Sequence, residues 1–263
     1  MLLELYTSQS IVETEMRRKI FEWYTRFDLH GSLMSGNETA LGREWFSAID
    51  TYYRQESLNF PTDINIKFDV AIAKHRLMCT DMALLFAKLP RKAISFAEFQ
   101  EESNRFAKQI DNWSDDLDPV FRDEQEHRVM DFGGKKKDPD DIVDPYLPGG
   151  LSTGPMFSFN FMLQDLLAIT VMFKYKMALL LEQPPPLELH NLALELCRLF
   201  ETIEYWAEAP SGAILKAHAS LAIATLFLPK DERHIMWCRR KLAKVESLGF
   251  VLAAQSFYEA PLA

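Results

Sequence analysis

Glycine and proline, the residues that most often interrupt helices and strands, are few in this chain and unevenly placed. The 263 residues include 10 glycines and 13 prolines, many of them gathered around residues 133–155 and 184–186. A fold of many short strands needs turn residues at regular, short intervals along the sequence. The distribution therefore predicts an all-α fold.

The segments between these clusters carry apolar residues at helical spacing. Ser10 with Glu13 and Ser95 with Glu98 have the spacing of capping boxes, which begin helices. Together the patterns predict about seven to nine helices. We expect them over residues 10–31, from 43, from 62 to 90, from 95 to the acidic run at 111–118, and over 157–181, 187–207, 213–228 and 231–248.

Residues from about 114 to 156 combine glycines, prolines and charged residues, a composition that resists regular structure. We expect a long irregular loop there. Such connections are usually functional or disordered. No internal repeat is visible, so the sequence favours a single helical domain over residues 1–263 with this loop in its middle.

Charge and cysteine content narrow the function classes. The formal net charge of −9 disfavours direct binding to nucleic acid or to an anionic membrane. Three cysteines far apart, Cys79, Cys197 and Cys238, cannot form a disulfide framework or a CxxC-type metal site. With no apolar stretch of the right length for a signal peptide or a membrane span, we expect an intracellular protein.

Asp140-Asp141-Ile142-Val143-Asp144 spells the DDxxD pattern with which helical terpene cyclases hold magnesium. That chemistry needs a helix that aims its carboxylates into a cavity, whereas Pro139 and Pro145 place this segment in a loop. The pattern is therefore interpreted as a solvated acidic turn, and no metal site is predicted. The basic runs 135–137 and 239–241 are likewise interpreted as solvated surface.

Two side chains are candidates for catalysis. His218 lies in a small, apolar segment, where an imidazole could act as an acid, a base or a polarising group; the simpler interpretation is a core histidine bonded to the backbone. Asp165 lies in an apolar helix and would need a partner there. No phosphate-binding loop, nucleophile elbow or other cofactor-binding motif is present, so no cofactor is predicted.

Aromatic residues on the most apolar helices suggest where a ligand could bind. Methionine and phenylalanine pack cores, but they also form adaptable walls around apolar small molecules. If this chain has such a pocket, the expected ligand-binding residues are Trp23, Phe27, Phe157 and Phe161.

Several segments resemble the regulatory region of fungal zinc-cluster transcription factors. The residues that carry the resemblance are RRKIFEWYTRFDLHGSLMSGNETALGREWF (17–46), RLMCTDMALLFAKLP (76–90), DPDDIVDPY (138–146), FETIEYW (200–206) and SLAIATLFLPKDERHIMWCRRKLAKVESLGF (220–250). They run through most of the chain. The resemblance implies an all-α regulatory domain and makes DDIVD a turn of that family.

Two departures from that family bear on function. Its members carry a module in which six cysteines bind two zinc ions, which three cysteines cannot supply. The residues after Phe250 also differ from the family's pattern. We therefore expect a chain that does not bind DNA by itself.

Two hypotheses about function follow. The first is a regulatory, effector-sensing domain linked to secondary metabolism, which binds an apolar small molecule, acts through other regulatory proteins and resides in the nucleus. The second is a cytoplasmic enzyme recruited from such a domain, which folds a polyketide or terpenoid for a cyclisation or a pericyclic, Diels-Alder-type step. That chemistry depends on shape and on exclusion of water more than on a catalytic triad.

Overall fold

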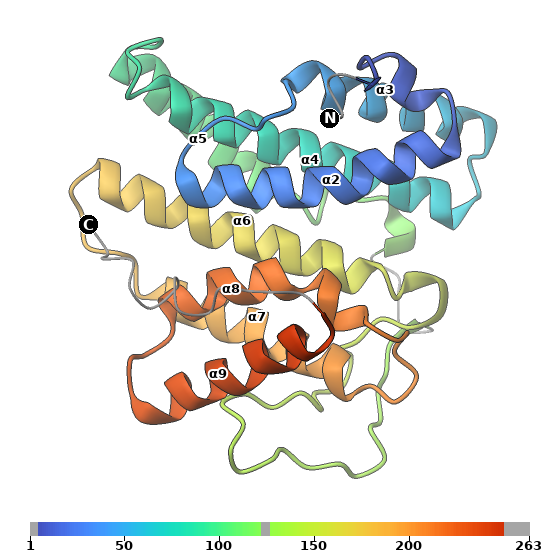
Figure 1. Ribbon diagram of the computed structural model, residues 1–263, viewed down its shortest axis with the longest axis vertical. Helices are drawn as coiled ribbons and strands as arrows, with labels where there is room; N and C mark the ends of the chain where they lie inside the picture. The colour runs from blue at the N-terminus through green and yellow to red at the C-terminus, as the bar shows by residue number, and fades with distance from the viewer. Residues whose placement is uncertain (1–4, 122–126, 250–263) are drawn as a thin grey trace. The chain divides into compact units, whose positions relative to one another are not determined.

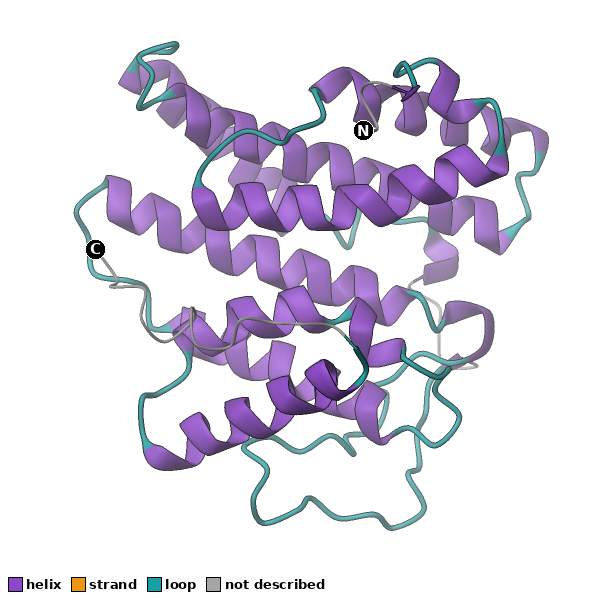
Figure 2. Cartoon of the chain, in the orientation of Figure 1, coloured by secondary structure: helices purple, strands orange, loops and turns teal. Residues whose placement is uncertain are grey.

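The computed structural model describes residues 5–121 and 127–249 (Figure 1). Over these residues the regular structure consists of eight α-helices and a few short 3-10 turns, with one isolated bridge pair and no strand (Figure 2). The prediction of an all-α fold with an irregular mid-chain loop is confirmed. The chain divides into two compact units, residues 1–123 and 124–263. The expectation of a single domain over residues 1–263 stays a prediction.

The described residues of the N-terminal unit form four α-helices. These are α2 (Glu15–Ser35), α3 (Arg43–Asn59), α4 (Ile64–Lys88) and α5 (Phe96–Asp111). Figure 1 shows α2 and α3 alongside α4, and α4 packs against both. Because α4 is covered on several sides, its buried residues are distributed around it rather than along one stripe. It forms the core of this unit.

Two ends of the expected first helix differ from the prediction. Ser10 does not cap an α-helix: residues Ser10–Val12 form a 3-10 turn, and the side chain of Thr14 caps α2 by accepting from the backbone N–H of Arg17. The helix also continues through Gly31 and ends at Ser35, where it is followed by Gly36, whose φ of 74° suits a residue without a Cβ atom. The capping box of Ser95 and Glu98 at the start of α5 is present.

Four α-helices also make up the regular structure of the C-terminal unit between residues 127 and 249, apart from its short 3-10 turns. These are α6 (Phe159–Leu180), α7 (Glu188–Tyr205), α8 (His218–Phe227) and α9 (Glu232–Ser247). Helix α6 packs against α7 and α8, and α7 packs against α8. The expected helix over residues 213–228 is a 3-10 turn, Ala213–Lys216, followed by α8.

The mid-chain loop closes on itself at its base. Arg128 and Ser152 form the isolated bridge, and the backbone N–H of Val129 donates to the carbonyl of Leu151 at 3.0 Å. Phe132 and Tyr146 pack their rings together further along the loop, with centroids 5.6 Å apart. The loop is thus an ordered excursion over its described residues, and it presents residues 138–146 to α7 and α9.

Candidate functional site

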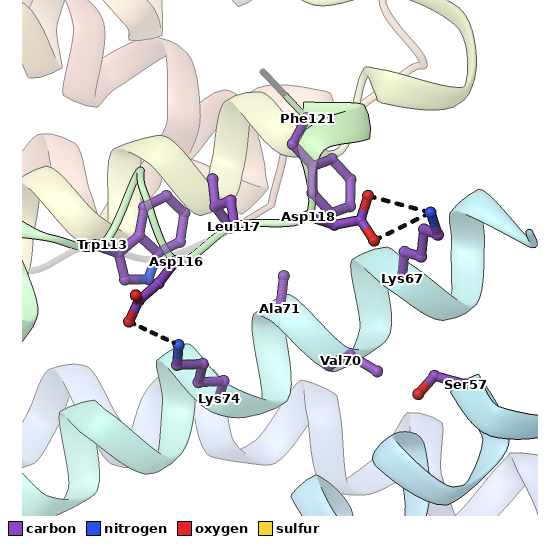
Figure 3. Close-up of a pocket in the computed structure, with 10 residues that line it drawn as sticks. All are labelled: Ser57, Lys67, Val70, Ala71, Lys74, Trp113, Asp116, Leu117, Asp118 and Phe121. Atoms are coloured by element: carbon purple, nitrogen blue, oxygen red, sulfur yellow. Dashed lines mark hydrogen bonds and ion pairs between the residues drawn. The ribbon is translucent and has the colours of Figure 1, made fainter. Parts of the chain in front are cut away.

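A cavity of about 140 Å³ in the N-terminal unit is the first candidate site (Figure 3). It lies between α4 and the segment that follows α5. Its apolar lining comes from Val70 and Ala71 of α4 and from three residues of that segment, Trp113, Leu117 and Phe121. Lys67, Lys74, Asp116, Asp118 and Ser57 supply its polar lining. The cavity is therefore apolar with a charged rim.

Two ion pairs form this rim. Lys67 and Lys74 are seven residues apart, about two turns, so they share one face of α4. The Lys67 Nζ lies 3.0 Å from a carboxylate oxygen of Asp118, and the Lys74 Nζ lies 3.1 Å from Asp116. Figure 3 shows both pairs beside the aromatic rings. The acidic run after α5 thus acts as a clamp that holds the segment 113–121 against α4.

A second cluster lies in the C-terminal unit, centred on the ammonium of Lys241. This Nζ lies 2.7 Å from Glu204 Oε2, 2.9 Å from Glu201 Oε1 and 3.7 Å from Asp141 Oδ1, and it donates to the hydroxyl of Tyr205 at 3.0 Å. The side chain of Lys241 is 2% exposed, and those of Asp141 and Glu201 are fully buried. An ammonium occupies the place where three carboxylates converge.

Further donors surround the same carboxylates. The Arg240 guanidinium pairs with Asp141 Oδ1, and the Tyr205 hydroxyl donates to Asp141 Oδ2 at 3.0 Å. The Trp237 indole N–H donates to Glu201. The cluster thereby joins the mid-chain loop to α7 and α9, and its buried charges are compensated by one another.

The cluster changes the acidity of its members. Burial and, after it, the neighbouring Asp141 carboxylate raise the pKa of Glu201 from 4.5 to about 7, although Lys241 and Trp237 act to lower it. Burial acting alone would lower the pKa of Lys241, but Glu204, Tyr205 and Glu201 raise it above its ordinary value. Burial also raises the pKa of Tyr205 to about 12. Glu201 thus titrates near neutral pH.

The interpretation of DDIVD as a solvated turn is wrong at its second residue. Asp140 is exposed, but Asp141 is fully buried and paired with Arg240 and Lys241. The interpretation of residues 239–241 as solvated surface is wrong at Lys241 for the same reason. Among the described residues, no group of three His, Cys, Asp or Glu side chains could hold a metal ion.

The expected site residues fall in both units. Trp23 and Phe27 of α2 lie in the N-terminal unit with ring centroids 5.0 Å apart, and Trp23 is 67% exposed. Phe27 lines a shallow cavity of about 370 Å³ together with Tyr24 and Asp28. Phe157 and Phe161 lie in the C-terminal unit, 5.6 Å apart, with Lys216 over the ring of Phe161. Their role in ligand binding stays a prediction.

The two catalytic candidates have structural partners. The Nδ1 of His218 lies 2.6 Å from the carbonyl oxygen of Leu215. Because a carbonyl only accepts, this nitrogen carries the proton, as in the interpretation of a core histidine bonded to the backbone. Asp165 accepts a hydrogen bond from the Ser220 hydroxyl at 3.1 Å, which supplies the partner that its apolar helix requires. Catalysis by either residue stays a prediction.

Two arrangements in the N-terminal unit were missed from the sequence. His75 Nε2 and Cys79 Sγ are 3.5 Å apart one turn along α4, and both side chains are buried. Asp69 lies near Glu22, which accepts a hydrogen bond from the Tyr53 hydroxyl at 3.1 Å. Burial and the Glu22 charge raise the pKa of Asp69 to about 7. The (i, i+4) spacing of His75 and Cys79 was the signal that could have revealed the first pair.

Among the described residues, one stretch, Gly154–Leu180, is long and apolar enough to cross a membrane by length and composition, and most of it is buried. Core helices of globular units have the same composition.

Comparison of the chain with protein-family models, with curated proteins and with solved structures finds no match.

Proposed function

We propose that this chain is a regulatory, effector-sensing helical domain of the fungal zinc-cluster transcription-factor type, which acts through partner proteins in secondary metabolism. The observation that carries the proposal is a set of contacts. Segments that resemble this family but lie far apart in the sequence contact one another within each unit. In the C-terminal unit, Asp141 of DPDDIVDPY, Glu201 of FETIEYW and Lys241 of the last segment belong to one buried cluster.

The N-terminal unit supports the proposal in the same way. Arg43 lies in the segment 17–46 and Asp81 in the segment 76–90, and their side chains form a two-point ion pair, with Arg43 Nη2 3.0 Å from Asp81 Oδ2. Paired contacts of this kind hold specific orientations.

The cavity beside α4 is the proposed effector site of this domain. It combines apolar walls with a few polar groups, which is the usual composition of a ligand site. Its rim is made of ion pairs between α4 and the segment 113–121. A ligand that changes the spacing of these two elements would change the surface that the unit presents to a partner protein.

Deletion of the gene in its host tests the proposal. Transcripts of neighbouring genes and small-molecule products are measured in the same cultures. We expect the transcripts of a gene set to fall and to recover when the wild-type chain is restored. Unchanged transcripts together with loss of one metabolite and accumulation of its precursor would refute a regulatory role.

The alternative is an enzyme recruited from this kind of domain that catalyses a cyclisation or pericyclic step. Asp69 favours it, since a carboxyl group with a pKa of about 7 suits general acid–base catalysis at neutral pH. The cavity beside α4, of about 140 Å³, is too small to enclose a polyene chain, so this alternative requires another cavity, such as the one of about 370 Å³ that Phe27 lines. The variant Asp69→Asn tests the alternative: an enzyme that uses Asp69 would lose product formation while the transcripts stay unchanged.

A further inference from the structure

The cavity beside α4 has the volume of a single aromatic ring. Its volume is about 140 Å³. Engineered apolar cavities of about 150 Å³ in another protein stay dry and bind benzene. Ligands of drug size need cavities of about 300–1,000 Å³. The volume therefore limits the ligand to one ring with a small substituent.

The wall of this cavity holds a hydrogen-bond donor that the described residues leave without an acceptor. Trp113 is 4% exposed and lines the cavity. Its ring packs edge-on against His75, at 6.2 Å between ring centroids. The indole nitrogen is not among the buried polar atoms without a partner, so water reaches it in the empty cavity. A ligand with an acceptor atom would take the place of that water.

The charged groups of the rim are already balanced. Lys67 is paired with Asp118, and Lys74 with Asp116. An anionic ligand would approach two carboxylates, and a cationic ligand would approach two ammonium groups. An uncharged ligand avoids both conflicts, and it faces the apolar side chains of Ala71, Leu117 and Phe121 (Figure 3).

We propose that the cavity between α4 and the segment 113–121 binds an uncharged, single-ring aromatic molecule whose substituent accepts a hydrogen bond from Trp113. The physiological role of such a ligand rests on the proposed effector-sensing function, but its binding does not.

Phenol and benzene are the matched probes, with benzoate as the anionic comparison. The chain contains five tryptophans, so a ¹H–¹⁵N spectrum of the full chain has at most five indole N–H signals. The Trp113 signal is assigned by its absence in Trp113→Phe. We expect phenol to shift this signal and to bind about three- to tenfold more tightly than benzene, the gain from one hydrogen bond. Benzoate is expected to bind more weakly than phenol.

Two variants locate the binding. Trp113→Phe keeps an aromatic wall and removes the donor, so the ratio of phenol to benzene affinity should fall to about one, since the gain of one hydrogen bond is lost. Ala71→Phe fills the cavity and should abolish binding of both probes. Ala97→Phe, at an exposed position of α5, is the matched control and should bind like the wild type. Thermal unfolding of each variant verifies that it is folded.

Three results would overturn the proposal: equal affinities for phenol and benzene in the wild type, tighter binding of benzoate than of phenol, or wild-type binding by folded Ala71→Phe. These results are independent of the gene-deletion experiment. If phenol and benzene bind equally well while the gene deletion lowers the transcripts, the proposed ligand is refuted and the regulatory function stands. If phenol binds as expected while the transcripts do not change, the ligand stands and the regulatory function is refuted.

Discussion

Replacing Lys241 by methionine measures how much the buried cluster contributes to stability. Methionine retains much of the side-chain volume but leaves Asp141, Glu201 and Glu204 without their shared cation. Removing one partner from a buried ion pair costs about 3–5 kcal/mol. We expect Lys241→Met to lower the free energy of unfolding by about this amount in urea titrations.

Lys244→Met is the control for this prediction. Lys244 pairs with the same Glu204, at 2.8 Å, but its side chain is 52% exposed. Exposed ion pairs contribute about 0–1 kcal/mol. Similar losses in the two variants would mean that burial of Lys241 has no special energetic role.

Glu201 predicts a pH dependence of stability. Its pKa is about 7 in the folded chain against an ordinary value of 4.5. The folded state therefore holds the proton more tightly, and the stability that this provides is complete below pH 4.5 and lost as the pH rises through 7. At about 1.4 kcal/mol per unit, the loss is about 3 kcal/mol. We expect urea titrations at pH 5 and pH 8 to show this decrease in the wild type.

Glu201→Gln tests the assignment of that effect. Glutamine resembles the protonated acid and can still accept from the Trp237 indole. We expect its stability to change less between pH 5 and pH 8 than that of the wild type. An identical pH dependence in both proteins would assign the effect to other groups, of which Asp69 is the first to examine.

The residues of this cluster show where prediction from sequence ends. Asp141 and Arg240 are 99 positions apart, and their pairing depends on how the mid-chain loop folds back onto α9. A run of charges in a proline-rich segment has the composition of solvated surface, so local patterns gave no signal of burial. The partners of Asp165 and His218 were partly foreseeable, because an apolar helix must satisfy its polar side chains.

Two non-glycine residues with positive φ values, one after α4 and one after α6, are sites where we expect glycine to stabilise the chain. Lys92 and Glu182 follow these helices with φ values of 55° and 52°, a conformation that favours glycine. The N–H of Gln183 bonds to the carbonyl of Ala178, as in a glycine-terminated helix end. We expect Glu182→Gly and Lys92→Gly each to raise the unfolding free energy by about 0.5–1 kcal/mol.

Gln183→Gly provides the comparison, since Gln183 does not have a positive φ. Glycine there gains no relief of strain and adds flexibility to the unfolded chain, so it should lower stability or leave it unchanged. If all three glycine variants behaved alike in urea titrations, the positive φ values would not be a source of strain.

The helices were predictable because their signals are local. Apolar spacing located the eight α-helices that the structure describes, and the capping box of Ser95 and Glu98 marked the start of α5. The start of α2 was misplaced because Thr14, like Ser10, is a good capping residue and only tertiary contacts choose between them. Gly31 failed as a stop because glycine is tolerated inside a helix of 21 residues.

Calorimetry can decide whether the chain unfolds as one domain or as two, because the number of unfolding transitions differs. The sequence predicts a single domain over residues 1–263, and contacts divide it into units at residue 123. A single domain unfolds in one cooperative transition. We therefore expect Lys241→Met to move one transition of the whole chain to lower temperature. Two transitions, of which only one moves, would make the units separate domains.

The burial of Lys241 also makes this residue a natural probe of how fast the C-terminal unit opens. Acylating reagents attack the neutral amine, and Lys241 is both enclosed and held as an ammonium by its carboxylate neighbours. Exposed lysines such as Lys244 should react within the first moments of labelling. Label should accumulate on Lys241 only as fast as the C-terminal unit opens, so mass spectrometry of this single residue reads out the opening rate without any engineered probe.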